Sequence, residues 1–292
     1  MPDSIGDFHR IITSIVKSAN PQISVRLTKL IYPRLRLKEA QSMKNLLSIL
    51  FLCPFAFLLV TCGDTSVTRD PEQNEVYPII IVTDAFKFIL HEGVTREQAG
   101  EIGDSLQANR ERIMDHLRVT VMPRVTIALW SRSHSDDFYN EMRNRIGQVY
   151  PGATGYTPSS TEMCLLWDQT MARGSVHEFA HLVSIALKPN ISNNPRWLWE
   201  AIAQYESRTF DHPSTWPSTD RTFPGFSQLN QYNSPLPYRW GYFIVALVLE
   251  RWGDDAYINL IMSNGNTSSA IGIPEEEFGK LVEEYVKKLV GG

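Results

Sequence analysis

Residues 175–205 read SVHEFAHLVSIALKPNISNNPRWLWEAIAQY and carry the strongest pattern in the sequence. Apolar residues recur around His177 and His181 at helical spacing, and Pro189 closes the run, which predicts a helix over 175–187. Positions i and i+4 of a helix lie on one face, one turn apart. The two imidazoles therefore point in the same direction, away from the apolar side of the helix.

The run from His177 to His181 has the form H-E-x-x-H, which is typical of a zinc site. Two imidazoles one turn apart reach a single tetrahedral Zn²⁺ at about 2.0–2.1 Å. The intervening carboxylate of Glu178 then lies beside the metal, where it would take a proton from metal-bound water. A chain of this composition is expected to contain on the order of 0.01 such runs by chance. The alternative is a pair of surface histidines on an ordinary helix.

A catalytic zinc usually has three protein ligands and one open position, so two histidines are not enough. The next expected helix, 197–209, begins Trp-Leu-Trp-Glu. H-E-x-x-H followed by W-L-x-E-x-x-A-x-Y, with 18 residues between His181 and Glu200, resembles the gluzincin metallopeptidases, the clan of thermolysin and aminopeptidase N. The resemblance implies that Glu200 is the third zinc ligand, although Ala201 stands where the family usually has Gly. The alternative for Glu200 is a solvated charge on a helix.

The resemblance extends to residues 237–243, PYRWGYF, which are similar to the Y-x-x-G stretch that opens a late apolar helix in the aminopeptidases. There the Tyr hydroxyl stabilises the oxyanion, which implies that role for Tyr238. Tyr242, and His212 in the preceding loop, are the alternatives. The aminopeptidase motif G-A-M-E-N is absent, and the run over 152–156 does not match it.

Residues 76–292 are expected to form the gluzincin-like metallopeptidase domain, which has an α+β fold. The prediction is a small mixed sheet with an edge strand over the HExxH helix, followed by a mostly helical C-terminal lobe. The resemblance implies that the edge strand is 162–167 and that it pairs with the substrate backbone. The other expected elements are strands over 76–83 and 119–130, helices over 95–117, 136–146, 238–252, 256–262 and 274–289, and loops over 150–160 and 210–237.

The composition excludes several classes of protein. The chain has 292 residues, of which 43% are hydrophobic, so it is neither disordered nor a polytopic membrane protein. An isoelectric point near 6.0 argues against a nucleic-acid partner. Only three Cys are present, which excludes a disulfide-dense scaffold. Cys164 lies in an apolar run and is expected in the core.

Residues 43–66 read MKNLLSILFLCPFAFLLVTCGDTS and resemble a bacterial lipoprotein signal. The apolar stretch over 46–60 has the length of a secretory signal and is short for a membrane span. It ends in a lipobox-like sequence, in which Cys62 would be acylated. We therefore expect 43–61 to be a signal peptide and 62–75 a flexible tether. The alternatives are a buried core helix or a true membrane anchor.

The first 42 residues precede this signal, although a signal peptide normally begins near the start of a chain. They hold seven basic and three acidic residues, whereas residues 62–292 hold 20 basic and 29 acidic ones. We expect 1–42 to be an upstream extension from a misassigned initiation codon; the alternative is a cytosolic segment. A chain starting at Met43 would be anchored in the bacterial cell envelope through Cys62, on the periplasmic or outer-membrane face.

These features predict a lipid-anchored, zinc-dependent metallopeptidase that hydrolyses peptide or protein substrates, with Glu178 as general base. One alternative is a surface binding or scaffold lipoprotein that keeps the fold without turnover. Another is a structural zinc site, which would normally have a fourth Cys or His ligand. The sequence leaves the substrate, the choice between endo- and exopeptidase action, and the oligomeric state open.

Overall fold

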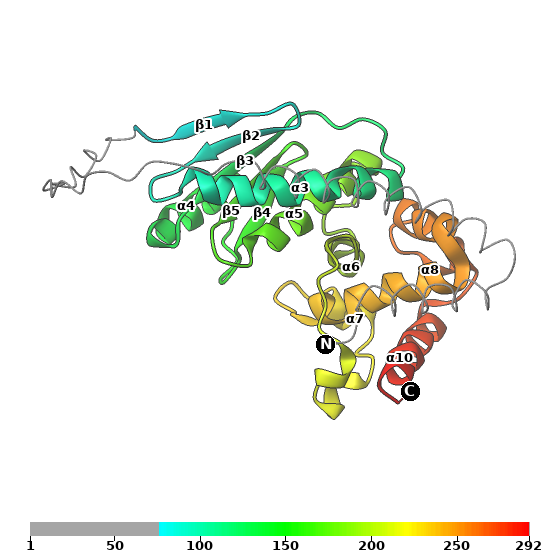
Figure 1. Cartoon of the computed structure of the whole chain (residues 1–292). Coiled ribbons are helices and arrows are strands. Elements are labelled where there is room, and N and C mark those ends of the chain that lie inside the picture. Colours follow the sequence, from blue (N-terminus) through cyan, green and yellow to red (C-terminus); the bar gives the residue numbers. More distant parts are fainter. Residues whose placement is uncertain (1–75, 292) are drawn as a thin grey trace, which may run out of the picture. The chain divides into compact units, whose positions relative to one another are not determined.

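The structure is a computed structural model that describes residues 76–291 (Figure 1). These residues belong to one compact unit, Pro71–Gly292. The predictions for 1–42, for the signal peptide over 43–61, and for the tether and Cys62 over 62–75 lie outside the described residues.

A five-stranded mixed sheet forms the N-terminal half of the described chain, as predicted for an α+β fold. Its order is β1-β2-β3-β5-β4, with parallel pairs in the centre and an antiparallel pair at each side. The strands are β1 Ile79–Val82, β2 Phe86–Leu90, β3 Val125–Trp130, β4 Gly155–Ser159 and β5 Glu162–Leu166.

The predicted edge strand is wrong in one respect, because β5 is an inner strand and β4 is the edge. Residues 155–159 were expected to be loop, since the sequence GYTPS has no run of apolar or β-branched residues. Only Tyr156 of this strand is buried, which explains the missing pattern. The strand expected over 119–130 begins at Val125 instead, beyond Pro123.

The helices agree well with the sequence prediction. Thr95 caps the first helix with a full capping box to Gln98, and Gly253, with a φ of 82°, breaks the long late helix where its end was predicted. No helix within 76–291 is long and apolar enough to cross a membrane.

The helices of the described chain, with the short 3-10 helices labelled η, are α3 Arg96–His116, η1 Arg132–His134, α4 Ser135–Ile146, α5 Met171–Leu187, α6 Arg196–Ser207, η2 Pro213–Thr215, η3 Ser218–Arg221, α7 Phe226–Leu229, α8 Leu236–Met262, α9 Thr267–Ile271 and α10 Glu275–Gly291.

Alternation along the strands divides the core into two layers, one on each face of the sheet. On one face, side chains such as Phe86 and Ile127 pack against α3 and α5. On the other face, Ala128 and the free Cys164 pack against α4, so the predicted core position of Cys164 is confirmed. Helix α5 is therefore held against the sheet by its apolar side, which leaves its histidine-bearing side to face the helical half.

Helices α6 and α8 pack closely because two small residues meet at their crossing. A Cβ added at Gly241 would lie 2.7 Å from Cα of Ala201, a separation that only glycine permits. The glycine of the Y-x-x-G sequence is thus required by the packing of α8 on α6. Gly241 lets the backbones approach, and Tyr238, one turn earlier on α8, is brought beside Glu200 of α6.

Candidate metal centre

The three residues predicted to bind metal converge at the contact of α5 and α6. Nε2 of His177 lies 3.3 Å from Oε2 of Glu200, and Nε2 of His181 lies 3.6 Å from the same oxygen. The candidate ligand atoms all lie within 4.8 Å of one another. His181 and Glu200 are each only 4% exposed. The spacing read from the sequence therefore corresponds to one compact cluster.

The donor set fits a zinc ion. Oε2 of Glu200 is buried and has no hydrogen-bond partner among residues 76–291, although two imidazole nitrogens face it. A buried carboxylate oxygen without a donor is energetically costly. A divalent cation between the three atoms would remove that cost, and two imidazole nitrogens with one carboxylate oxygen form a common catalytic zinc set.

Electrostatics favours the protonation states that ligands need at Glu200 and His181, whereas at His177 burial lowers the pKa and the adjacent Glu200 outweighs it, so that the pKa is raised. Burial opposes a charge on Glu200, but the adjacent His177 and His181 outweigh it and hold the pKa of Glu200 well below its usual range. Burial lowers the pKa of His181 to about 4. At neutral pH, His181 is thus an uncharged imidazole and Glu200 is a carboxylate.

Trp199 fixes the ring of His181, and it comes from the same Trp-rich run as Glu200. The two rings stack with centroids 4.0 Å apart and planes at 9°. Trp197, two residues earlier, is 1% exposed and packs on Phe226 in the core of the helical half. The Trp-Leu-Trp-Glu sequence therefore anchors α6 on one side and orients a histidine on the other.

Glu178 lies directly beneath the edge strand β4. A Cβ added at Gly155 would be 2.6 Å from Oε1 of Glu178, so any larger residue at this position would displace the Glu178 side chain. Glu178 is partly exposed, and no described residue donates a hydrogen bond to its carboxylate. Burial raises its pKa to about 7; the negative charge of Glu200 adds to this and His177 opposes it. Gly155 was missed because the run over 152–156 was compared only with the G-A-M-E-N motif.

Tyr238 and Arg196 hold the second oxygen of Glu200. The Tyr238 hydroxyl donates to Oε1 at 3.1 Å, and the Arg196 guanidinium donates to the same atom at 2.9 Å and to the Tyr238 oxygen at 3.4 Å. With Oε1 held in this way, Oε2 is turned toward the two imidazoles. Arg196 was not predicted, although its position four residues before Glu200 on one helix was a usable signal.

The alternatives to Tyr238 make their contacts elsewhere. Tyr242 stacks on Phe210 at 4.0 Å and on Tyr205 at 5.2 Å, within an aromatic cluster. His212 caps η2, with its Nδ1 accepting from the backbone N–H of Ser214. Of these three residues, only Tyr238 has a described contact with the metal-site residues.

A second buried carboxylate on α6 was not predicted. Glu206 is fully buried, and its carboxylate forms hydrogen bonds with three side chains from other helices: Arg112 at 3.1 Å, His116 at 2.6 Å and Tyr257 at 3.3 Å. Every partner is a hydrogen-bond donor, so the group is satisfied without a cation. We interpret it as a structural tie between α3, α6 and α8.

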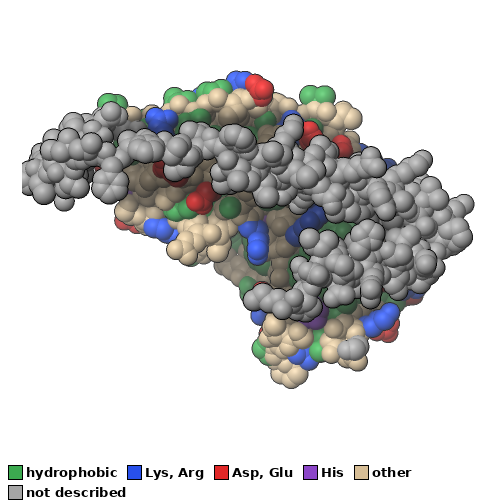
Figure 2. Space-filling model, viewed as in Figure 1, with side chains coloured by type: hydrophobic (Ala, Val, Ile, Leu, Met, Phe, Trp, Pro, Cys, Tyr) green, Lys and Arg blue, Asp and Glu red, His purple; other side chains and the backbone are tan. Residues whose placement is uncertain are grey.

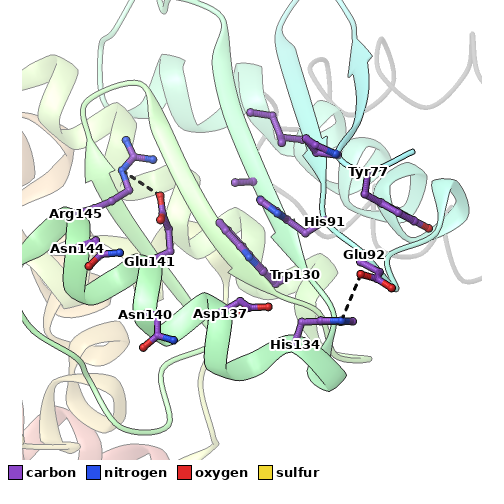
Figure 3. Close-up of a pocket in the computed structure, with 13 residues that line it drawn as sticks. Tyr77, His91, Glu92, Trp130, His134, Asp137, Asn140, Glu141, Asn144 and Arg145 are labelled. Carbon is purple, nitrogen blue, oxygen red and sulfur yellow. Dashed lines mark ion pairs between the residues drawn. The ribbon is translucent and has the colours of Figure 1, made fainter. Parts of the chain in front are cut away.

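A pocket of about 660 Å³ lies on the other face of the sheet, between β2, β3 and α4 (Figure 3). Figure 3 shows His91 and Trp130 side by side on its floor, and Glu141 with Arg145 along α4. It shares no lining residue with the metal centre. In Figure 2, the acidic and basic side chains that are visible are interspersed.

No family model matches this chain, and a search of curated proteins finds no match. The resemblance to the gluzincin metallopeptidases therefore depends on the motif residues and on their geometry.

Proposed function

We propose that this protein is a zinc-dependent metallopeptidase of the gluzincin type. The observation that carries the proposal is the convergence of His177, His181 and Glu200, with the Glu178 carboxylate next to them beneath an edge strand. A structural zinc site would not need a free carboxylate beside it. It would also need a fourth Cys or His, and none of the described residues adds one to this cluster.

Glu178 would act as the general base and then as the general acid. When bound, zinc would polarise the scissile carbonyl and acidify the attacking water. Glu178 would accept the proton of that water and deliver it to the leaving amine. Its carboxylate suits this role because it is partly exposed and has no hydrogen-bond donor of its own among residues 76–291.

The edge strand favours a peptide over another hydrolysable substrate. The N–H of Leu166 donates to the carbonyl of Thr154 at 2.8 Å, and Gly155 lies opposite Leu165. In an antiparallel ladder this alternation turns the N–H and C=O of Gly155 away from β5, toward the open edge. An extended peptide would pair with that edge directly above Glu178. This is the role predicted for 162–167, transferred to β4.

Tyr238 would stabilise the oxyanion, with Arg196 as its support. A donor aimed at developing negative charge is worth about 10²- to 10³-fold in turnover. The Tyr238 hydroxyl lies one hydrogen bond from a zinc-ligand candidate and is held by Arg196. The hydroxyl would turn from Glu200 to the substrate oxygen, while Arg196 keeps Glu200 in place.

Zinc-dependent turnover of a peptide library tests the proposal. The protein should cleave peptides, lose this activity with a chelator, and regain it when zinc is restored. Cleavage that a chelator leaves unchanged, or a complete absence of cleavage by zinc-loaded protein, would contradict the proposal. Peptide binding without turnover would favour the alternative of a scaffold lipoprotein.

We further propose that the protein is a lipoprotein of the bacterial cell envelope, attached through Cys62. Native material should begin at Cys62, carry acyl chains and partition with membranes, because several acyl chains on one residue give stable anchoring. Cys62→Ser should block lipidation but leave zinc content unchanged. Mass spectrometry of the mature N-terminus checks this. Peptides from residues 5–36 in the membrane fraction would overturn both the lipoprotein and the start-site predictions.

A further inference from the structure

We propose that the pocket between α4 and the ends of β2 and β3 binds a small organic cation, an amidinium or guanidinium group carried by an apolar body. The pocket has a volume of about 660 Å³ and lies on the face of the sheet opposite to α5 (Figure 3). Small-molecule sites fall in the range of about 300–1,000 Å³. The inference does not depend on the proposed peptidase function, because the pocket shares no lining residue with the metal centre.

The pocket exists because α4 covers only part of this face of the sheet. The helix packs on β3, β4 and β5, and the hollow begins beside it, over β2. Ile89 of β2 lines the hollow. Its neighbour on β1, Ile80, is 56% exposed, which shows that the described chain leaves this part of the face open.

The floor of the pocket is aromatic. Ala128 and Trp130 alternate onto the same face of β3, and His91 directly follows β2, the parallel neighbour of β3. The rings of His91 and Trp130 stack with centroids 4.0 Å apart and planes at 11°. Burial lowers the pKa of His91, against the opposing charges of Glu141 and Asp137. The imidazole is therefore uncharged at neutral pH, and the floor does not repel a cation.

The walls of the pocket carry an excess of negative charge. Asp137 and Glu141 lie one turn apart on one face of α4, and Glu92 adds a third carboxylate from the end of β2. None of residues 76–291 donates a hydrogen bond to the Asp137 carboxylate or forms an ion pair with it. Among the lining residues the one guanidinium is that of Arg145, which lies 2.5 Å from Glu162 of β5 and 4.0 Å from Glu141. Its charge is thus already paired by a carboxylate outside the lining.

Aromatic rings beside carboxylates select an organic cation. A guanidinium-type group is planar and weakly hydrated, so it stacks on aromatic rings and pairs with carboxylates at the same time. A metal ion fits less well, because among the described residues the ligand atoms that converge for one are those of His177, His181 and Glu200. The apolar side chains of Ile89 and Ala128 would contact the body of the ligand.

Benzamidine is the probe for this site, and benzamide, which has nearly the same shape without the charge, is the matched ligand. The full chain should bind benzamidine with a Kd of about 1 mM or lower, and benzamide at least about fivefold more weakly. Asp137→Asn and Glu141→Gln should each weaken benzamidine binding by about two- to fivefold, and the double variant by about tenfold. Isothermal titration calorimetry measures these affinities.

Asp136→Asn is the control variant, because Asp136 is exposed on the same turn of α4 and does not line the pocket. Its affinity for benzamidine should equal that of the wild type. Absence of benzamidine binding, or benzamide binding of equal strength, would overturn the proposal. So would an unchanged affinity in the double variant, since the ligand would then bind elsewhere. Loss of binding in Asp136→Asn equal to that in Asp137→Asn would also overturn it, because net charge alone would explain both. None of these outcomes bears on peptide cleavage, which tests the proposed function separately.

Discussion

Glu178→Gln is expected to reduce peptide hydrolysis by about 10²- to 10⁴-fold, the range for a positioned general base. Glutamine has the same shape as glutamate and fits under Gly155, but its amide cannot accept the proton. The fold and the zinc content should therefore be unchanged, because neither depends on the charge of this side chain. Steady-state kinetics on a cleaved peptide, with metal analysis of the same sample, measures both quantities.

A second variant displaces the Glu178 carboxylate by changing a residue of the strand that lies over it. Gly155→Ala would place a methyl group 2.6 Å from Oε1 of Glu178, so the carboxylate has to move and activity should fall although Glu178 is intact. Gly100→Ala on α3 is the matched control, since an added Cβ there meets nothing within 4 Å. If Glu178→Gln retained wild-type turnover, the general-base assignment would be wrong, whatever the effect at Gly155.

The sequence was informative where residues that can bind metal lie in a segment whose apolar residues follow helical spacing. The helix around His177 and the helix around Glu200 each bury an apolar side and carry unusual polar residues on the other side. Their type and spacing therefore predicted both the helices and the cluster that the structure brings together. The capping box at Thr95 and the break at Gly253 were equally local signals, because each depends on only a few adjacent residues.

The sequence was less informative where tertiary packing decides. Strand β4 is defined by its pairing with β5 and by the close approach of Gly155 to Glu178, and neither contact leaves a local pattern. Strand β2, Phe86–Leu90, alternates between buried and partly exposed side chains, and so could have been recognised by its period of two. The stacking contact between Tyr150 and Tyr232 joins loops 82 residues apart in the sequence, which no motif connects.

The two buried carboxylates of α6 show how tertiary partners decide a role. Glu200 and Glu206 lie on one helix, and both are nearly or fully buried. Glu206 is bonded by Arg112, His116 and Tyr257, whereas one oxygen of Glu200 has no hydrogen bond. We therefore expect the same substitution at the two positions to have different effects, one on metal binding and the other on stability.

Glu206→Gln should lower the free energy of unfolding by about 1.5–3 kcal/mol, the range for hydrogen bonds to charged groups, and leave zinc affinity unchanged. The hydrogen bond to Glu206 raises the pKa of His116 above 6.5, against the effect of burial. The pairing of His116 with Glu206 therefore stabilises the fold fully at pH values below the ordinary pKa of histidine. This stabilisation is lost as the pH rises through the raised pKa. Chemical denaturation should show a larger loss near pH 6 than near pH 8.

Glu200→Gln should weaken zinc binding by about 100-fold or more, because even a residue that only supports a metal ligand costs about 10- to 100-fold. Glutamine keeps the size of the side chain and an oxygen for Tyr238, so the packing of α6 on α8 should survive. Competition with a chromogenic chelator measures the affinity. Wild-type zinc affinity in Glu200→Gln, or loss of zinc in Glu206→Gln, would reverse the assignment of the two carboxylates, because only one of them has an oxygen left for a cation.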